Sequence, residues 1–331
     1  MAQKLRWGVL GCARIAVTRV IPAILNSQRG ELVAVASRGE EKARETAGRL
    51  GIPKAYGSYE ALLEDSDIDA VYIPLPNHLH REWTIRAARA GKHVLCEKPL
   101  ALTAAEAEEM VRVCADAGVH LAEAFMYRHH PRIARIRQIL ASGEIGELRA
   151  IRGVFTFNRP EDKGNVRFVA DYGGGSIYDV GCYPISASRW ITGREPVAVT
   201  AHAFFSPEHD NVDMAASGLV EYEGGVALTF FCGMWAEPQQ TLEIIGSRGM
   251  IQVPVAFVSG PDDAGFRVVT DGRERFEPAE GVDIYAAEAD DFARVVFGET
   301  PPLFPPEDAV KNMRVLEAAL RSAKERKRIE L

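Results

Sequence analysis

The sequence predicts two domains: an α/β domain with a doubly wound parallel sheet, and after it an α+β domain with a large, mostly antiparallel sheet. At 331 residues the chain is long for one hydrophobic core and comfortable for two. Short apolar strands alternate with helices up to about residue 125, which is typical of a parallel sheet. Longer segments that alternate apolar and polar residues follow, as in antiparallel sheets. We place the domains at residues 1–125 and 126–331, and leave open that the carboxyl-terminal helix packs back on the first domain.

The first domain should alternate strands and helices along its length. Expected strands are residues 5–10, 32–36, 70–73, 93–96 and 119–123. Expected helices run to residue 25 and over residues 40–50, 59–64, 78–90 and 103–117. Thr103 and Glu106 form the capping box that begins the last of these helices. We interpret His78 and His80 as residues of a helix start.

A dinucleotide-binding turn is predicted directly after the first strand. The turn leads into an apolar-periodic helix, whose first N–H groups receive a pyrophosphate in a Rossmann-type fold. Ala13 stands where the Gly-x-Gly-x-x-Gly pattern has its middle glycine, which should push the backbone slightly away from the phosphates. An ordinary strand-to-helix turn is the alternative interpretation of so short a pattern. The predicted cofactor-binding residues here are Gly11, Cys12, Ala13, Arg14 and Ile15.

The end of the second strand indicates which cofactor is preferred. About twenty residues past the glycines, the fingerprint has an acid that binds the ribose 2′-hydroxyl. Ser37 and Arg38 stand there instead, and a hydroxyl with a guanidinium would bind and neutralise a 2′-phosphate. Glu40 and Glu41 follow, but they suit the first turn of the next helix. The sequence therefore favours NADP(H), with NAD(H) as the alternative.

A lysine follows the strand at residues 93–96. Ligands of open α/β sheets bind outside the carboxyl ends of the strands, so the ammonium of Lys98 can point into the binding crevice. Pro99 biases Lys98 away from the α region and raises the odds of a cis bond. The alternative is a surface lysine in an ordinary turn. Residues expected to border the cofactor at this edge of the sheet are Pro76, Asn77, Glu97 and Lys98.

The second domain should combine long strands with few helices. After a helix ending at residue 140, strands are expected at residues 148–157, 197–205, 218–222, 226–235, 240–245 and 250–253. Three glycines at 173–175 permit a sharp entry into a helix. This helix carries Asp179 and Tyr183 at positions i and i+4, hence on one face. Such a pair is either functional or a core tyrosine bonded to a carboxylate.

Composition and charge exclude several classes of function. The net charge of -7 argues against a nucleic-acid or anionic-membrane partner, because both call for basic patches. The five cysteines have neither a disulfide framework nor metal-ligand spacing, so no metal is expected. The sequence has no apolar run of membrane-spanning length and no signal-peptide core before its first strand. We therefore expect a cytoplasmic protein.

Four motifs together resemble the Gfo/Idh/MocA family of nicotinamide-dependent oxidoreductases, named for glucose–fructose oxidoreductase and inositol dehydrogenase. They are residues 11–16, 97–99, 123–128 and 173–183, and they are spaced as in that family. Inositol dehydrogenase-type members carry a histidine where this chain has Tyr183. The tyrosine is similar to the branch that holds glucose–fructose oxidoreductase, xylose dehydrogenases and dimeric dihydrodiol dehydrogenase. That branch handles aldoses and related polyols.

The resemblance implies a hydride transfer between the nicotinamide and a sugar-like hydroxyl or carbonyl. Tyr183 would serve as acid/base, and Lys98 would be the cation that stabilises its phenolate, since a free tyrosine with a pKa of about 10 is a poor base at neutral pH. Asp179 would orient the substrate or Lys98. Arg128 and Arg159 are candidate substrate-binding residues, although an ion pair is the other role of an interface arginine. The alternatives are a non-catalytic NADP-binding regulator and a redox-assisted glycosidase with a tightly held cofactor.

An assembly is predicted from the strand at residues 226–235. It is apolar at nearly every position, so both of its faces must be covered. The helices of the domain can shield one face, and soluble monomers rarely expose a large apolar patch. We therefore predict a homodimer or homotetramer formed through this sheet, an association that the family resemblance also implies. Cover by the chain's own loop at residues 257–266 is the alternative.

Overall fold

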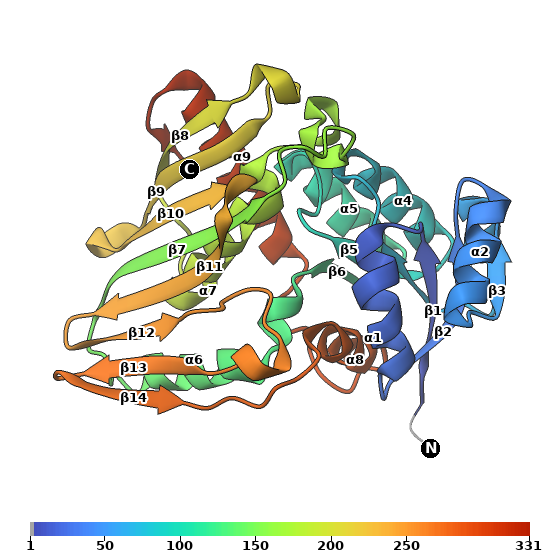
Figure 1. Cartoon of the computed structure of the whole chain (residues 1–331). Coiled ribbons are helices and arrows are strands. Elements are labelled where there is room, and N and C mark those ends of the chain that lie inside the picture. Colours follow the sequence, from blue (N-terminus) through green and yellow to red (C-terminus); the bar gives the residue numbers. More distant parts are fainter. Residues whose placement is uncertain (1–2) are drawn as a thin grey trace. The chain divides into compact units, whose positions relative to one another are not determined.

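The computed structural model describes residues 3–331, which form two compact units (Figure 1). The first unit runs to His129 and also includes Asp283–Val310. The second comprises His130–Val282 and Lys311–Leu331. A single division near residue 125 was predicted from the sequence, whereas the chain returns to the first unit for residues 283–310 before it ends in the second.

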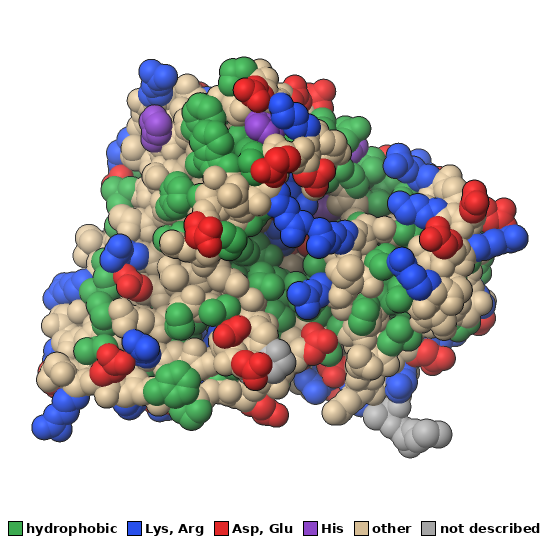
Figure 2. All heavy atoms as spheres, viewed as in Figure 1, with side chains coloured by type: hydrophobic (Ala, Val, Ile, Leu, Met, Phe, Trp, Pro, Cys, Tyr) green, Lys and Arg blue, Asp and Glu red, His purple; other side chains and the backbone are tan. Residues whose placement is uncertain are grey.

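The surface is of mixed charge. Figure 2 shows lysine, arginine and acidic side chains interspersed over the face in view, with hydrophobic side chains between them. In residues 3–331 no helix is long and apolar enough to span a bilayer. The same residues contain no group of three or more histidine, cysteine or acidic side chains arranged to hold a metal ion.

The sheet of the first unit is parallel throughout its described strands. Its order is β3-β2-β1-β4-β5-β6, and the strand order reverses between β1 and β4. This confirms the predicted doubly wound sheet. The short β3 was not expected, because its three half-buried residues contain no apolar run. The strands are β1 (Leu5–Leu10), β2 (Gly30–Ala36), β3 (Lys54–Tyr56), β4 (Ala70–Ile73), β5 (His93–Glu97) and β6 (Leu121–Ala124).

The helices of the first unit follow the predicted alternation. The capping box is confirmed, since the Thr103 hydroxyl accepts the Glu106 N–H at 3.1 Å. The first helix departs from expectation, because part of it is a π-helix with a wider turn. The helices are the π-helix η1 (Ala16–Val20), α1 (Ile21–Asn26), α2 (Glu40–Leu50), α3 (Tyr59–Leu63), α4 (Asn77–Arg89), α5 (Ala104–Asp116), the 3-10 helix η2 (Met126–His129) and α8 (Ile284–Val296).

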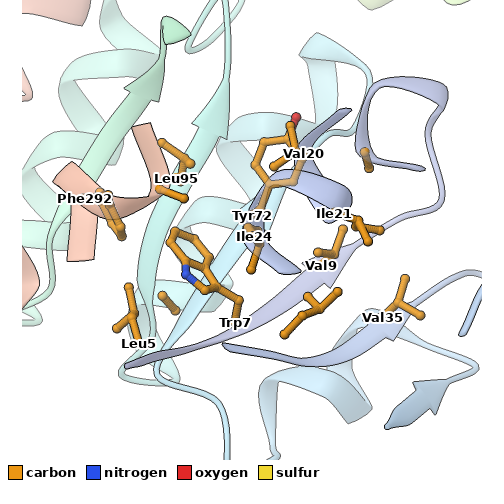
Figure 3. Close-up of a cluster of buried hydrophobic side chains, with 14 of the residues drawn as sticks. Leu5, Trp7, Val9, Val20, Ile21, Ile24, Val35, Tyr72, Leu95 and Phe292 are labelled. Atoms are coloured by element: carbon orange, nitrogen blue, oxygen red, sulfur yellow. The ribbon is translucent and has the colours of Figure 1, made fainter. Parts of the chain in front are cut away.

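Helix α8 explains why a late segment belongs to the first unit. The ring centroid of Phe292 lies 5.4 Å from that of Trp7 on β1 (Figure 3). Ala289 and Ala293 on the same helix are buried in the same hydrophobic cluster. Burial of apolar surface at about 25 cal/mol per Å² favours this docking. Trp7 and Phe292 are far apart in the sequence, so a local sequence pattern could not predict their contact.

The second unit contains a nine-stranded sheet in the described part of the chain. Its order is β14-β13-β12-β11-β7-β10-β9-β8-β15; β7 and β10 run parallel and the other neighbours run antiparallel. This confirms the predicted, mostly antiparallel sheet. The strands are β7 (Leu148–Asn158), β8 (Ala198–Phe205), β9 (Asp213–Glu221), β10 (Ala227–Gly233), β11 (Trp235–Gly246), β12 (Gly249–Val253), β13 (Phe266–Thr270), β14 (Arg273–Glu277) and β15 (Ile329–Glu330).

One face of this sheet is covered by helix. Helix α7 packs on β7 and β10 (Figure 1), and a Cβ at Gly153 would lie only 2.5 Å from Pro184 Cβ. The bounds are α6 (Pro131–Ala141), the π-helix η5 (Ile177–Gly181), α7 (Cys182–Thr192) and α9 (Glu307–Glu325). Short 3-10 helices are η3 (Val166–Phe168), η4 (Ala170–Tyr172), η6 (Pro207–His209), η7 (Glu223–Gly225) and η8 (Pro261–Asp263).

The other face of this sheet is more exposed. On β10, Phe230 is buried toward α7, whereas Thr229 is exposed and Phe231 is half-buried. Phe204 and Trp235 stack with centroids 4.6 Å apart and remain 43% and 42% exposed. The second unit therefore shows an apolar surface on the face opposite α7.

Candidate active site

The turn after β1 requires glycine at its first position. Gly11 has φ of +122°, and a Cβ there would lie 3.1 Å from the side chain of Leu75. The Gly11 N–H donates to the Ala36 carbonyl at 2.9 Å, which ties the turn to the end of β2. The turn is therefore a close-fitting backbone segment at the carboxyl edge of the sheet, where the fingerprint predicts cofactor phosphates.

The end of β2 places Ser37 and Arg38 beside this turn. Ser37 is buried and its N–H donates to the Tyr56 carbonyl at 3.0 Å, while Arg38 is exposed. The hydroxyl of Tyr59 is 3.7 Å from the position of a Cβ on Gly11. Burial raises the pKa of Tyr59, and the nearby Arg38 cation lowers it in part. Tyr59 is a site residue that the sequence analysis missed, since its pattern indicated only a helix start.

More cations lie between η1 and α2 than the sequence analysis selected. A cavity there is bordered by two predicted cofactor residues, Cys12 and Arg14. Lys42 and Arg49, both on α2, also line it and were not predicted. They were not predicted because charged residues at helical spacing are typical of an ordinary solvent-exposed helix face.

The turn after β5 carries the predicted lysine. The Lys98–Pro99 peptide bond is cis, and Lys98 is half-buried. The Tyr72 hydroxyl on β4 donates to Glu97, and the Lys98 N–H approaches the other oxygen of that carboxylate at 3.3 Å. Burial raises the pKa of Tyr72, and so does the Glu97 charge. Glu97 thus links the ends of two neighbouring strands directly beside Lys98.

Pro76 and Asn77 begin helix α4 at the end of β4. Pro76 is the N-cap, Asn77 is the first helical residue, and both are half-buried. As predicted, His78 and His80 lie in the first turn of this helix. His80 is fully buried. Burial lowers its pKa to about 4, so its ring is neutral at pH 7.

Arg128 lies in η2 and is buried. Its guanidinium pairs with Asp308 at 2.8 Å and lies over the rings of Phe125 and Phe304, at 4.6 Å and 4.1 Å from their centroids. The ion pair is the alternative role that the sequence analysis left open for this arginine. Substrate binding by Arg128 remains a prediction.

The glycine-rich segment of the second unit ends at a buried acid. Gly175 has φ of +115°, and a Cβ there would lie 2.0 Å from Asp213 Oδ1. Asp213 Oδ2 accepts the Ser176 hydroxyl at 2.8 Å and the Ile177 N–H at 2.7 Å. The start of the helix that carries Asp179 is therefore held by a carboxylate from β9, a partner 36 residues away that the sequence analysis did not find.

Asp179 and Tyr183 lie on one continuous helix, as predicted. Its first part is the π-helix η5, a form that is frequent at functional sites. Asp179 Oδ2 accepts a hydrogen bond from Arg167 Nε at 2.7 Å. Arg167 was missed, because it lies in the 3-10 helix η3, which is too short to show a periodicity in the sequence.

Tyr183 is buried among aromatic rings. Its centroid lies 5.0 Å from that of Phe155 on β7 and 5.4 Å from that of Phe257. Arg132 donates to the Ala256 carbonyl at 2.6 Å, which holds the irregular segment that carries Phe257. Phe257 therefore lies on the α7 side of the sheet, and its loop does not place this ring over the open face.

Arg159 is exposed at the end of β7. Its backbone N–H donates to the Met234 carbonyl at 3.0 Å. Its predicted role in substrate binding is untested by these contacts. Lys98 belongs to the first unit and Tyr183 to the second, so their partnership also remains a prediction.

A Rossmann-type sheet with a cofactor turn, joined to a separate sheet-based domain, defines a class of nicotinamide-dependent oxidoreductases. The chain is an enzyme of this class. It belongs to the Gfo/Idh/MocA family, which confirms the resemblance seen in its motifs. Residues 5–125 match the oxidoreductase family with an NAD-binding Rossmann fold, and residues 133–252 match the GFO/IDH/MocA C-terminal domain.

Relatives are similar over nearly the whole chain. A D-xylose 1-dehydrogenase (NADP(+)) from Haloferax volcanii is 41% identical over 98% of this chain and 99% of its own. A 3-ketoreductase from Actinomadura kijaniata, solved with NADP and TDP-benzene, superposes with a TM-score of 0.90 at 33% identity, covering 97% and 98% of the two chains. The aldose-aldose oxidoreductase from Caulobacter crescentus gives a TM-score of 0.92 at 28% identity, covering 99% and 100%.

Proposed function

We propose that the protein is an NADP-dependent oxidoreductase that acts on a hydroxyl or carbonyl of an aldose or related polyol. One observation carries the proposal. This chain, a member of the family, has a half-buried lysine beyond β5, and it has Asp179 and Tyr183 on one helix. The D-xylose dehydrogenase and the aldose-aldose oxidoreductase support the substrate class, because each is named for a redox reaction of a sugar.

The cofactor residues fit a nucleotide. Gly11 has a backbone conformation that residues with a side chain rarely adopt, as in a turn that approaches phosphates. Arg38 would bind the 2′-phosphate, and the absence of an acid at this position supports NADP(H) over NAD(H). Pro76, Asn77 and Lys98 would border the nicotinamide. When bound, the nicotinamide supplies or accepts the hydride.

The protein's own residues would handle the proton. In the oxidative direction the Tyr183 phenolate would take the proton of the substrate hydroxyl, and in the reductive direction its hydroxyl would return it. Lys98 would stabilise the phenolate by its positive charge. Asp179, held by Arg167, would orient the substrate hydroxyl. The rings of Phe155 and Phe257 would restrict the motion of Tyr183.

The proposal includes the assembly and the location predicted from the sequence. Self-association through the open sheet face is supported by the exposed Phe204 and Trp235. Dimer or tetramer remains to be measured. A cytoplasmic location remains a prediction from the sequence.

Two substitutions test the catalytic roles. Lys98→Met and Tyr183→Phe should each lower kcat by about 10²- to 10⁴-fold, since each removes part of the acid/base couple. NADPH fluorescence titration should show that the cofactor still binds. Lys324→Met, on the exposed end of α9, and Tyr222→Phe, a buried tyrosine bonded to Ser188, are the matched controls and should retain turnover.

Near-normal rates in both active-site variants, across aldoses, cyclitols and diols, would refute the assigned roles. Gel filtration before the assay separates the alternatives. A cofactor that stays bound through the column would favour redox-assisted glycoside cleavage, whereas a cofactor that exchanges supports the dehydrogenase.

A further inference from the structure

We propose that His80 is a positioning residue for Lys98: its imidazole braces the turn that carries the lysine against the turn that begins helix α4. The inference rests on the proposed function, because His80 would act only through Lys98. Neither the sequence pattern nor the fold class assigns this histidine a role beyond starting a helix.

The geometry that carries the inference is a bridge between two turns. His80 Nδ1 lies 3.0 Å from the Pro99 carbonyl oxygen, and His80 Nε2 lies 2.8 Å from the Leu75 carbonyl oxygen. Pro99 follows Lys98 directly, so a displacement of its carbonyl moves the lysine with it. Leu75 precedes Pro76, which is predicted to border the nicotinamide. One buried side chain therefore connects the two segments whose separation would set the lysine's place beside the cofactor.

The protonation state of His80 suits this role. A neutral imidazole carries one N–H, so it donates to one of the two carbonyls, and the tautomer decides which; the bulk of the ring fills the space between the two turns. Burial of the ring lowers the pKa of His80; the contacts with the Leu75 and Pro99 carbonyls act in the opposite direction, and the positive charge of Lys98 adds a smaller lowering. A neutral ring can brace the turn without an imidazolium that would repel the lysine.

A buried histidine can also be a simple core residue, and Thr84 provides the comparison. Thr84 lies four residues later on α4 and is as deeply buried as His80. It lies about 6 Å farther along the helix axis from the β4–α4 turn. Thr84→Val thus perturbs the same helix core without altering the bridge.

Substitutions can separate the two halves of the bridge. The amide nitrogen of asparagine takes the place of His Nδ1, so His80→Asn should keep a donor that faces the Pro99 carbonyl. The amide nitrogen of glutamine takes the place of His Nε2, so His80→Gln should keep a donor that faces only the Leu75 carbonyl. His80→Phe keeps the ring's bulk and loses both ring nitrogens. Because a misplacement of about 1 Å can cost about 10²-fold in rate, kcat should fall by up to that factor in His80→Phe.

The ranking of the variants is the expected result. The value of kcat should decrease from wild type to Asn, then Gln, then Phe at position 80, with NADPH Kd and substrate KM close to those of Thr84→Val. The pH at which kcat/KM reaches half its maximum should rise in the same order, because a displaced Lys98 stabilises the phenolate less. Assays are run well below the melting temperature of each variant.

A double-variant cycle with Lys98→Met distinguishes the two levels of the proposal. If His80 acts through Lys98, His80→Phe adds no further loss of kcat in the Lys98→Met background. Wild-type turnover in Lys98→Met alone would refute the proposed function. The role of His80 would be overturned by a different result. In that result Lys98→Met is inactive, but kcat of the position-80 variants follows only their melting temperatures, as it does in Thr84→Val. If His80→Phe does not fold, the kcat values of His80→Asn and His80→Gln decide. A kcat of His80→Gln equal to or above that of His80→Asn overturns the role of His80.

Discussion

Asp213→Asn should change how the stability of the protein depends on pH. Asp213 is buried, and burial raises its pKa from 3.8 to about 6, although its bonds from Ser176 and Ile177 act in the opposite direction. The folded state therefore binds this proton more tightly than the unfolded chain. The stability that the protonated carboxyl contributes is complete below about pH 4 and is lost as the pH rises through about 6. At about 1.4 kcal/mol per pKa unit, the loss is on the order of 3 kcal/mol.

Urea unfolding at several pH values between 4 and 7.5 measures this effect. Asparagine keeps an acceptor oxygen for Ser176 and Ile177 and cannot ionise, so the free energy of unfolding of wild type relative to Asp213→Asn should fall by on the order of 3 kcal/mol across that range. Asp271→Asn removes one exposed carboxylate in the same unit and serves as the control. Parallel pH curves for wild type and Asp213→Asn would show that hydrogen bonding offsets burial and would refute the reasoning.

Three further predictions concern the cofactor preference, the assembly and the packing around Tyr183. Arg38→Ala should reduce the preference of kcat/KM for NADP over NAD by about 1.5–3 kcal/mol, the value of a charge-assisted hydrogen bond, and an unchanged ratio would contradict the cofactor assignment. Sedimentation equilibrium at micromolar concentration should give a dimer or tetramer that Phe231→Asp or Trp235→Asp weakens; a monomeric wild type would end this prediction, and unweakened variants would exclude this face. Phe257→Leu should lower kcat severalfold, because Tyr183 loses a ring contact of about 0.5–1.5 kcal/mol; unaltered kinetics would show that the ring contributes only to the core.

Much of the fold could be predicted because its signals are local. The apolar strand before Gly11, the capping box at Thr103 and the alternation of strands and helices each depend on neighbours within a few residues. The backbone hydrogen bonds of a helix and the periodicity of its side chains also involve only residues within that short range. The position of Lys98 after a buried strand was predictable for the same reason, since parallel strands present their carboxyl ends at one edge of a sheet.

Tertiary structure alone decided the contacts between distant segments. Phe292 packs on Trp7, Asp213 holds the start of the helix at Ile177, and no local pattern encodes either pair. The π-helical turns were also missed, because the choice between i+4 and i+5 bonding depends on what the helix packs against.

The candidate site also combines features that the sequence predicted with contacts that only the folded chain shows. The sequence by itself determined which residue types the site offers: a guanidinium after β2, a lysine after β5, and on a helix a tyrosine four residues after an aspartate. Only the folded chain showed what holds them, namely His80 between two carbonyls, Arg167 on Asp179 and Phe257 against Tyr183. The reason is physical: a residue's chemistry is fixed by its type, whereas its partners are chosen by the packing of segments that the chain brings together only when it folds.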